Sequence, residues 1–242
     1  MDANRLVAHR GDNTNYPENS YAGIEAALIA GALFIEFDIQ MNADGSLVVI
    51  HDADFNRTAN INASLFDTDD HSLKSVSVHE PTKFGEEHYP THIPHLKEVL
   101  TLLDRYPKAH FFVEVKEESL KQWGLSKVMG ELLIILKKYQ NQATIISFSR
   151  EAIEYTNSHS KIKTGFVFLK YNNNTHKISI KLKPSFLICS HLVIPDKDLW
   201  KGNWDWMIYT LNNKHAMEQA LKRKDIQFIE TDNISLMLRT QN

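Results

Sequence analysis

Short apolar runs rich in β-branched and aromatic residues alternate with longer amphipathic stretches along most of this 242-residue chain. Tyr21–Ala30 follows a Ser20 or Asn19 cap and stops at Gly31, so it is expected to be a helix. Eight strands joined by such helical crossovers over about 250 residues favour a TIM-like (β/α)8 barrel, with a doubly wound open sheet as the alternative. The expected strands are Leu6–His9, Leu33–Ile39, His110–Val115, Thr144–Phe148, Thr164–Leu169, Phe186–Ser190, Trp206–Leu211 and Phe228–Thr231.

One stretch departs from the alternation. After the second strand, "NADG" joins "FIEFDIQM" to "SLVVIHD", and two apolar runs joined by an Asp-Gly turn predict a β-hairpin. The chain is then polar and without clear periodicity until a helix resumes at "LKEVL". We therefore expect one barrel domain over residues 1–242, with an insertion of roughly residues 42–92, hairpin and loop, at one mouth of the barrel.

Three carboxylates lie in apolar strands. Glu36 and Asp38 are two apart, so they share one face of their strand, and Glu114 shares a face with Lys116 in "FFVEVK". Acids directed into a barrel lumen repel one another, and a hard divalent cation relieves that repulsion. Oxygen ligands favour Mg²⁺ or Ca²⁺. The alternatives are exposed strand faces or ion pairs with Arg10 and Lys116.

Two histidines stand at strand ends. His9 closes the first strand and His51 closes the returning arm of the hairpin, so both can face the mouth where the carboxylates project. Beside a carboxylate-bound metal and the cations Arg10 and Lys116, they resemble an acid and a base around a bound phosphate. Each histidine alone would be an ordinary structural residue.

Composition limits the partners. The formal net charge of −3 and pI near 6.5 predict neither nucleic acid nor an anionic membrane as a partner. The single cysteine, Cys189, forms no intrachain disulfide. The first strand begins within a few residues of Met1, and no apolar segment has the length of a signal peptide or a membrane span. We expect a cytoplasmic protein without a stable membrane anchor.

The motifs "AHRGDNTNYPENS", "GALFIEFDIQMNADGSLVVIHDADFNRT", "FFVEVK", "YTLNN" and "FIETDN" occur in order along nearly the whole chain. Together they resemble the glycerophosphodiester phosphodiesterase family, of the cytosolic single-domain type. The resemblance implies a TIM-like barrel and metal-dependent hydrolysis of glycerophosphodiesters to glycerol 3-phosphate and an alcohol. By the family's pattern the metal ligands are Glu36, Asp38 and Glu114, the catalytic acid and base are His9 and His51, and the phosphate-binding residues are Arg10 and Lys116.

Further residues near the mouth are candidates for supporting roles. Acids and an arginine there are expected to pair and hold the arm that ends at His51, whereas the aromatic residues are expected at the rim or in the core. Alternative functions are a phosphodiesterase for lysophospholipids or other phosphodiesters, and a non-catalytic phosphate-binding barrel. The sequence leaves open the alcohol, Mg²⁺ against Ca²⁺, the base among the two histidines, and the oligomeric state. The supporting candidates are Glu18, Asn19, Asp52, Phe148 and Tyr209.

Overall fold

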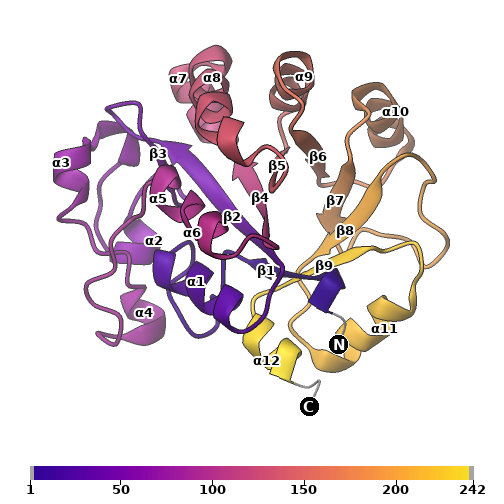
Figure 1. The fold of residues 1–242 in the computed structure, drawn as a ribbon, viewed down its shortest axis with the longest axis horizontal. Coiled ribbons are helices and arrows are strands. Elements are labelled where there is room, and N and C mark those ends of the chain that lie inside the picture. The colour runs from indigo at the N-terminus through magenta and orange to yellow at the C-terminus, as the bar shows by residue number, and fades with distance from the viewer. Residues whose placement is uncertain (1–2, 240–242) are drawn as a thin grey trace.

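The computed structural model describes residues 3–239 of the chain. Eight parallel strands form a ring in the order β1, β9, β8, β7, β6, β5, β4, β2, and pairing of β1 with β2 closes it (Figure 1). This closure confirms the predicted barrel and rules out the open sheet. The strands are β1 (Leu6–His9), β2 (Phe34–Met41), β4 (His110–Val115), β5 (Ala143–Ser147), β6 (Lys163–Phe168), β7 (Phe186–Ser190), β8 (Asp205–Tyr209) and β9 (Phe228–Thr231).

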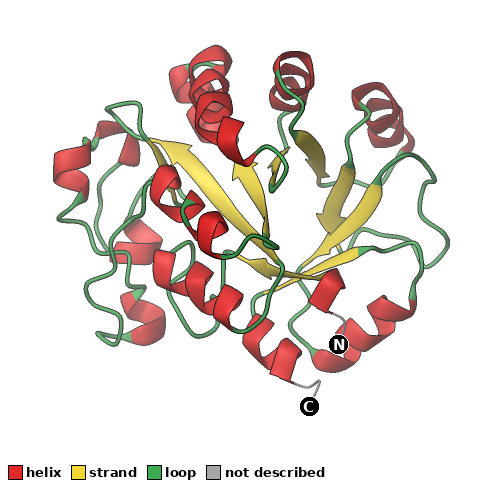
Figure 2. Ribbon diagram, viewed as in Figure 1, coloured by secondary structure: helices red, strands yellow, loops and turns green. Residues whose placement is uncertain are grey.

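Helices surround the barrel (Figure 2). The first begins where predicted, since the Ser20 hydroxyl caps it by accepting a hydrogen bond from the Gly23 N–H at 3.0 Å. The helix that begins at Leu125 ends at Leu136 and continues as a short 3₁₀ turn, Lys137–Tyr139. The surrounding helices are α1 (Tyr21–Ile29), α5 (Leu96–Leu100), α6 (Leu102–Arg105), α7 (Glu117–Trp123), α8 (Leu125–Leu136), α9 (Arg150–His159), α10 (Asn173–Leu182), α11 (Lys214–Lys222) and α12 (Ile234–Arg239).

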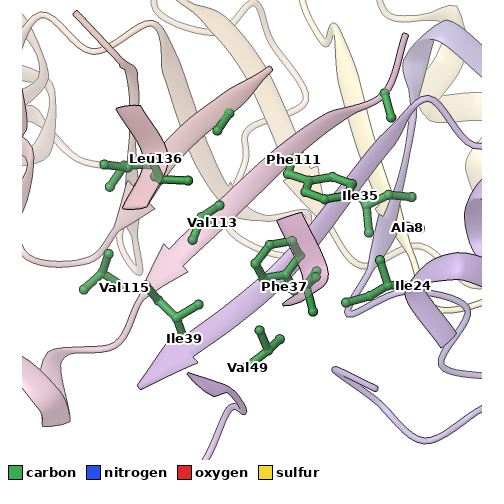
Figure 3. Close-up of a cluster of buried hydrophobic side chains, with 14 of the residues drawn as sticks. Ala8, Ile24, Ile35, Phe37, Ile39, Val49, Phe111, Val113, Val115 and Leu136 are labelled. Carbon is green, nitrogen blue, oxygen red and sulfur yellow. The ribbon is translucent and has the colours of Figure 1, made fainter. Parts of the chain in front are cut away.

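Side chains alternate along each strand between the helices and the lumen. On β2, Ile35, Phe37 and Ile39 belong to the buried outer core, which Figure 3 shows together with the neighbouring side chains of β4. The intervening residues Glu36 and Asp38 therefore face the lumen. The strand alternation thus fixes which acids reach the interior of the barrel.

The hairpin after β2 forms as predicted. β3 (Leu47–Val49) pairs antiparallel with β2, and the turn places Gly45 at φ +82°, a conformation that favours glycine. The chain then continues through the short helices α2 (Asn56–Ala59), α3 (Asp70–Leu73) and α4 (Pro81–Phe84), which lie beside α1 and β3 in Figure 1. This segment has a small hydrophobic core that the polar sequence did not indicate, formed by Val48, Ile50, Phe55, Ala59, Leu65, Leu73, Val76, Val78 and Ile93.

The connection from β7 to β8 differs from the expected alternation, because residues 191–204 contain no helix. Aromatic side chains cover the barrel there instead. Trp200 stacks on Tyr171 with a centroid separation of 3.8 Å, and the indole N–H of Trp206 donates to the Trp200 carbonyl at 3.1 Å. Tyr171, Trp200 and Trp204 are partly buried and pack against the hydrophobic core at this connection.

Candidate active site

Polar side chains gather at the carboxyl ends of the barrel strands. They surround a cavity of about 170 Å³, at the end of the barrel where TIM-barrel active sites lie. The structure brings all seven predicted catalytic, phosphate-binding and metal residues to this place, six of them in the cavity wall and Asp38 beside it. The cavity is lined by His9, Arg10, Glu36, His51, Glu114, Lys116, Ile146, Phe148, Val167, Ile188, Tyr209 and Glu230.

The three predicted metal ligands lie close together. Oxygen atoms of Glu36, Asp38 and Glu114 are all within 4.8 Å of one another, and the first two residues are only 2% and 1% exposed. Burial and the charge of Asp38 raise the pKa of Glu36 well above its ordinary value. Burial would also raise the pKa of Asp38, but the cations Arg10 and Lys116 outweigh it and lower that pKa. The two neighbouring acids therefore differ in how their charge is compensated.

Arg10 and Lys116 provide that compensation. The Arg10 guanidinium lies 3.1 Å from Asp38 and 3.0 Å from Glu18, and the Lys116 ammonium lies 2.8 Å from Glu114 and 3.4 Å from Asp38. The ion pairs considered as an alternative to a metal site are thus present for Asp38 and Glu114. Among residues 3–239, no arginine or lysine forms such an ion pair with Glu36, which instead accepts a hydrogen bond from the backbone N–H of Arg10 at 3.1 Å.

The unusual backbone conformation after β1 places the Arg10 side chain beside Asp38 and Glu18. Arg10 has φ +57°, a strained conformation for a residue with a side chain, and Gly11 follows at φ +85°. A Cβ atom on Gly11 would stand 2.7 Å from the backbone of Gly23, so only glycine fits. Asn19 then fastens this loop to β2, because its amide donates to the Asp38 carboxylate at 3.0 Å and accepts from the Asp38 N–H at 3.1 Å.

Each cavity histidine is held by a carboxylate. Nδ1 of His9 lies 2.6 Å from Asp232, and Nδ1 of His51 lies 2.6 Å from Asp52. The hydrogen bond to His51 lowers the pKa of Asp52 to about 2, and the bond to His9 lowers the pKa of Asp232 although burial opposes it. A carboxylate on Nδ1 orients the ring and leaves Nε2 free for proton transfer. The cavity therefore contains two histidine–carboxylate pairs.

Two of the predicted supporting residues, Glu18 and Asp52, are linked by Arg57 beside the His51–Asp52 pair. Arg57 donates from Nε to Asp52 at 2.7 Å and from its terminal nitrogens to Glu18 at 2.7 and 2.8 Å. The pairing of an arginine with acids that the sequence indicated is present. It links the loop after β1, through Glu18, to the arm that presents His51.

Another part of the cavity wall is apolar. Ile146, Phe148, Val167 and Ile188 come from β5, the turn after it, β6 and β7, and Tyr209 from β8 completes this wall. Burial, followed by the negative charge of nearby Glu230, raises the pKa of the Tyr209 hydroxyl. The two predicted aromatic residues, Phe148 and Tyr209, therefore line the cavity.

Two acids of the site, Glu230 and Asp232, were not predicted from the sequence. Both belong to "FIETDN", where Phe228 and Glu230 share the lumen face of β9 and Asp232 follows the strand end. Burial, with the charges of Glu114 and Asp38, raises the pKa of Glu230 well above its ordinary value. The alternation within "FIET" was the signal that could have identified Glu230 as a lumen acid.

A larger surface hollow of about 530 Å³ lies between the β7–β8 connection and the segment before β9, and its lining includes Trp200, Trp204, Arg223 and Asp225. Within residues 3–239, however, the groups of histidine, cysteine and acidic side chains close enough to hold a metal occur only at the barrel mouth. The smaller cavity is therefore the candidate active site.

An eight-stranded parallel barrel with carboxylates, paired histidines and two cations at the carboxyl ends of its strands defines a TIM-barrel protein with a highly charged pocket. The chain belongs to the glycerophosphoryl diester phosphodiesterase family, whose sequence model matches residues 9–236.

Individual relatives agree with this assignment. A glycerophosphodiester phosphodiesterase of Bacillus altitudinis is 36% identical over 127 residues, which cover 52% of this chain and 51% of that protein. Another, of Bacillus subtilis strain 168, is 32% identical over 161 residues, covering 61% and 53%. The chain thus spans about half the length of these curated relatives.

Solved structures share the fold over nearly the whole chain. An Oleispira antarctica phosphodiesterase in complex with the product sn-glycerol-3-phosphate has a TM-score of 0.84 at 19% identity, covering 97% of this chain and 95% of that one. A glycerophosphodiester phosphodiesterase from Thermotoga maritima has a TM-score of 0.75 at 22% identity, covering 98% and 97%. At such low identity these matches establish the barrel fold.

Proposed function

We propose that this protein hydrolyses glycerophosphodiesters to glycerol 3-phosphate and an alcohol. The observation that supports this most directly is the convergence of two histidine–carboxylate pairs, a carboxylate cluster and two cations on one cavity. Family membership supports the same reaction. The product bound to the Oleispira antarctica phosphodiesterase is the one that this reaction would release.

We propose that Glu36, Asp38 and Glu114 hold a divalent cation, Mg²⁺ or Ca²⁺. Four carboxylates, these three and Glu230, face the arginine and lysine of the site, so the buried groups carry an excess of negative charge that one divalent cation would neutralise. The donor atoms are all carboxylate oxygens, which suit these hard ions. When bound, such a cation stabilises the charge that develops on phosphoryl oxygens.

We assign the proton transfers to His9 and His51. The Asp232 and Asp52 carboxylates hold the Nδ1 atoms, so each Nε2 can exchange a proton with substrate. One histidine accepts the proton of the attacking hydroxyl, and the other gives a proton to the departing alcohol. Arg10 and Lys116 line the same cavity and are assigned to the phosphate oxygens.

The attacking group is proposed to be the 2-hydroxyl of the glycerol unit. Because this hydroxyl is held beside the phosphorus, its attack gains the effective molarity of an intramolecular reaction. The bond from O2 to phosphorus forms while the bond from phosphorus to the alcohol oxygen breaks, and water then opens the cyclic phosphate. An analogue that lacks only this hydroxyl should show a collapse of kcat. Comparable turnover of that analogue would instead favour direct attack by water.

We further propose that residues 1–242 act as a single catalytic domain, with residues 42–92 as an insertion at the active-site mouth that supplies His51. In the described part of the chain no helix is long and apolar enough to cross a membrane. We also propose that the substrate is a small molecule, that nucleic acid is not a partner, and that the protein is cytoplasmic.

A panel of substrates tests the reaction class. Purified protein should release choline from glycerophosphocholine and ethanolamine from glycerophosphoethanolamine, and EDTA should abolish both activities. Turnover of lysophosphatidylcholine alone would favour the alternative lysophospholipid activity. Binding of glycerol 3-phosphate without turnover of any diester would indicate a non-catalytic phosphate-binding barrel.

A further inference from the structure

Glu230 is a buried acid that has no catalytic, metal-binding or phosphate-binding role in the proposed reaction. Its side chain is 3% exposed and lines the cavity from β9, with a carboxylate oxygen within 4.8 Å of a ring nitrogen of His9 and an oxygen of Glu36. Among the side-chain hydrogen bonds and ion pairs of residues 3–239, none involves this carboxylate, which lines the cavity. A largely buried acid without a hydrogen-bond donor is best stabilised by a cavity ligand that supplies one.

The missing partner has to be a hydrogen-bond donor or a cation. A second cation is the weaker choice, because Glu36 already belongs to the first carboxylate cluster and His9 needs a free Nε2 to transfer protons. The phosphate of a glycerophosphodiester offers only acceptor oxygens and would be repelled. The hydroxyl groups of its glycerol unit are donors, and they match an acceptor that is enclosed in a small cavity.

The two free hydroxyl groups of the glycerol unit have different roles in the proposed reaction. The 2-hydroxyl must face phosphorus and give its proton to a histidine, so its donor is already engaged in the proposed reaction. The terminal hydroxyl has no such task. We propose that Glu230 accepts a hydrogen bond from the terminal hydroxyl of glycerol and thereby selects diesters in which this hydroxyl is free. This inference rests on the proposed function and deepens it.

The position of Glu230 also orients the substrate. In the ring of strands, β9 stands opposite β5 and is separated from it by β8, β7 and β6. Ile146 on β5 and Val167 on β6, two residues of the apolar wall, therefore lie across the cavity from Glu230. With the glycerol unit against β9, the leaving alcohol extends towards β5, β6 and β7. A substrate acylated on the terminal hydroxyl, as in a lysophospholipid, would lose the bond to Glu230 and crowd the β9 side.

The test measures kcat/KM for three substrates: glycerophosphocholine, its analogue lacking only the terminal hydroxyl, and lysophosphatidylcholine. Wild-type protein should prefer glycerophosphocholine to the deoxy analogue by about 10²-fold or more, because a buried acceptor left without its donor is costly. The Glu230→Ala variant should reduce this preference to within about threefold, and Glu230→Gln, which keeps an acceptor oxygen, should retain part of it. Relative turnover of lysophosphatidylcholine should rise in Glu230→Ala.

Two controls complete the experiment. Glu151→Gln removes an exposed acid of α9 and should leave the preference unchanged. Melting curves should show that both Glu230 variants are folded. An active wild-type enzyme that uses both glycerol substrates equally, or a preference that survives in Glu230→Ala, would overturn this inference alone. Wild-type protein that hydrolyses neither would overturn the proposed function as well. Fewer bound Mn²⁺ ions per chain in Glu230→Ala than in the wild type, with Mn²⁺ as the probe of the divalent site, would make Glu230 a metal ligand and contradict the inference.

Discussion

At the scale of single residues, the lumen position of each acid follows from strand alternation. Glu36 and Asp38 could be placed together from their spacing alone, and the positions of His9 and His51 at the ends of apolar runs placed both at the same mouth. The same alternation within "FIET" could have placed Glu230 in the lumen, whereas the contact of Asp232 with His9 depends on β9 closing the barrel against β1. Contacts between the two ends of a chain are set by topology, which local patterns do not encode.

The histidines make the first prediction at this scale. Replacing either His9 or His51 by alanine should lower kcat/KM by about 10²-fold or more while the protein stays folded, since each removes one proton transfer. The pH profile of wild-type kcat/KM should be bell-shaped, and each variant should lose one limb. A variant with a near-wild-type rate on an unactivated diester would exclude that histidine from catalysis.

The raised pKa of Glu36 leads to a second prediction. A carboxyl group whose pKa is raised by folding costs no stability below its ordinary value of 4.5, where it is protonated in both states. The cost grows as pH rises from there towards the folded value, because only the unfolded chain ionises readily in that range. In chelator, Glu36→Gln should therefore raise Tm by about 3 °C or more at pH 8 and hardly at all at pH 4.5. Glu118→Gln, on the exposed side of α7, is the matched control.

Added Mg²⁺ or Ca²⁺ at pH 8 should make the Tm of the wild type higher than that of Glu36→Gln, because the cation binds the folded wild-type protein and compensates the buried charge. Equal Tm values for the wild type and Glu36→Gln at pH 8, with and without the ion, would show that Glu36 neither bears an uncompensated charge nor binds metal.

At the scale of elements, the hairpin of β2 and β3 carries one of the two cavity histidines. Its existence was predictable because an Asp-Gly turn between two apolar runs is a strong local signal. The small core behind it was not, because the residues that pack on Val48 and Ile50 are scattered among polar ones from Phe55 to Ile93 and meet only after the chain folds back on itself. The helix-free connection from β7 to β8 escaped prediction for a related reason, since its tryptophans pack on residues distant in sequence.

Arg57 supplies the prediction for this element. It lies on α2 and joins Asp52 to Glu18, so it fixes the arm that presents His51. Arg57→Ala should lower kcat by about 10-fold with a smaller change in KM, because a misplaced histidine slows the chemical step more than binding. Arg57→Lys should restore only part of the rate, since lysine cannot bond both carboxylates in the same fork geometry. Unchanged kcat in Arg57→Ala would show that the pairing does not position His51, and Arg150→Ala on α9 is the control.

At the scale of the whole molecule, barrel closure is what turns separate acids, histidines and cations into one site. Residues from β1, β2, β4 and β9 and from the arm beyond β3 reach the same cavity only because their strands end at the same rim. The fold was predictable from the alternation of strands and helices over the length of the chain. The division of the cavity into a charged and an apolar side was not, since it depends on which strands stand opposite each other.

The most direct measurement of the central claim is phosphorus NMR of glycerophosphocholine incubated with the purified wild-type protein. With Mg²⁺ or Ca²⁺ present, the diester resonance should be replaced by that of glycerol 3-phosphate, and EDTA should stop the conversion. Each product reports which bond to phosphorus breaks. Release of phosphocholine instead of glycerol 3-phosphate, or conversion that continues unchanged in excess EDTA, would contradict a metal-assisted glycerophosphodiesterase.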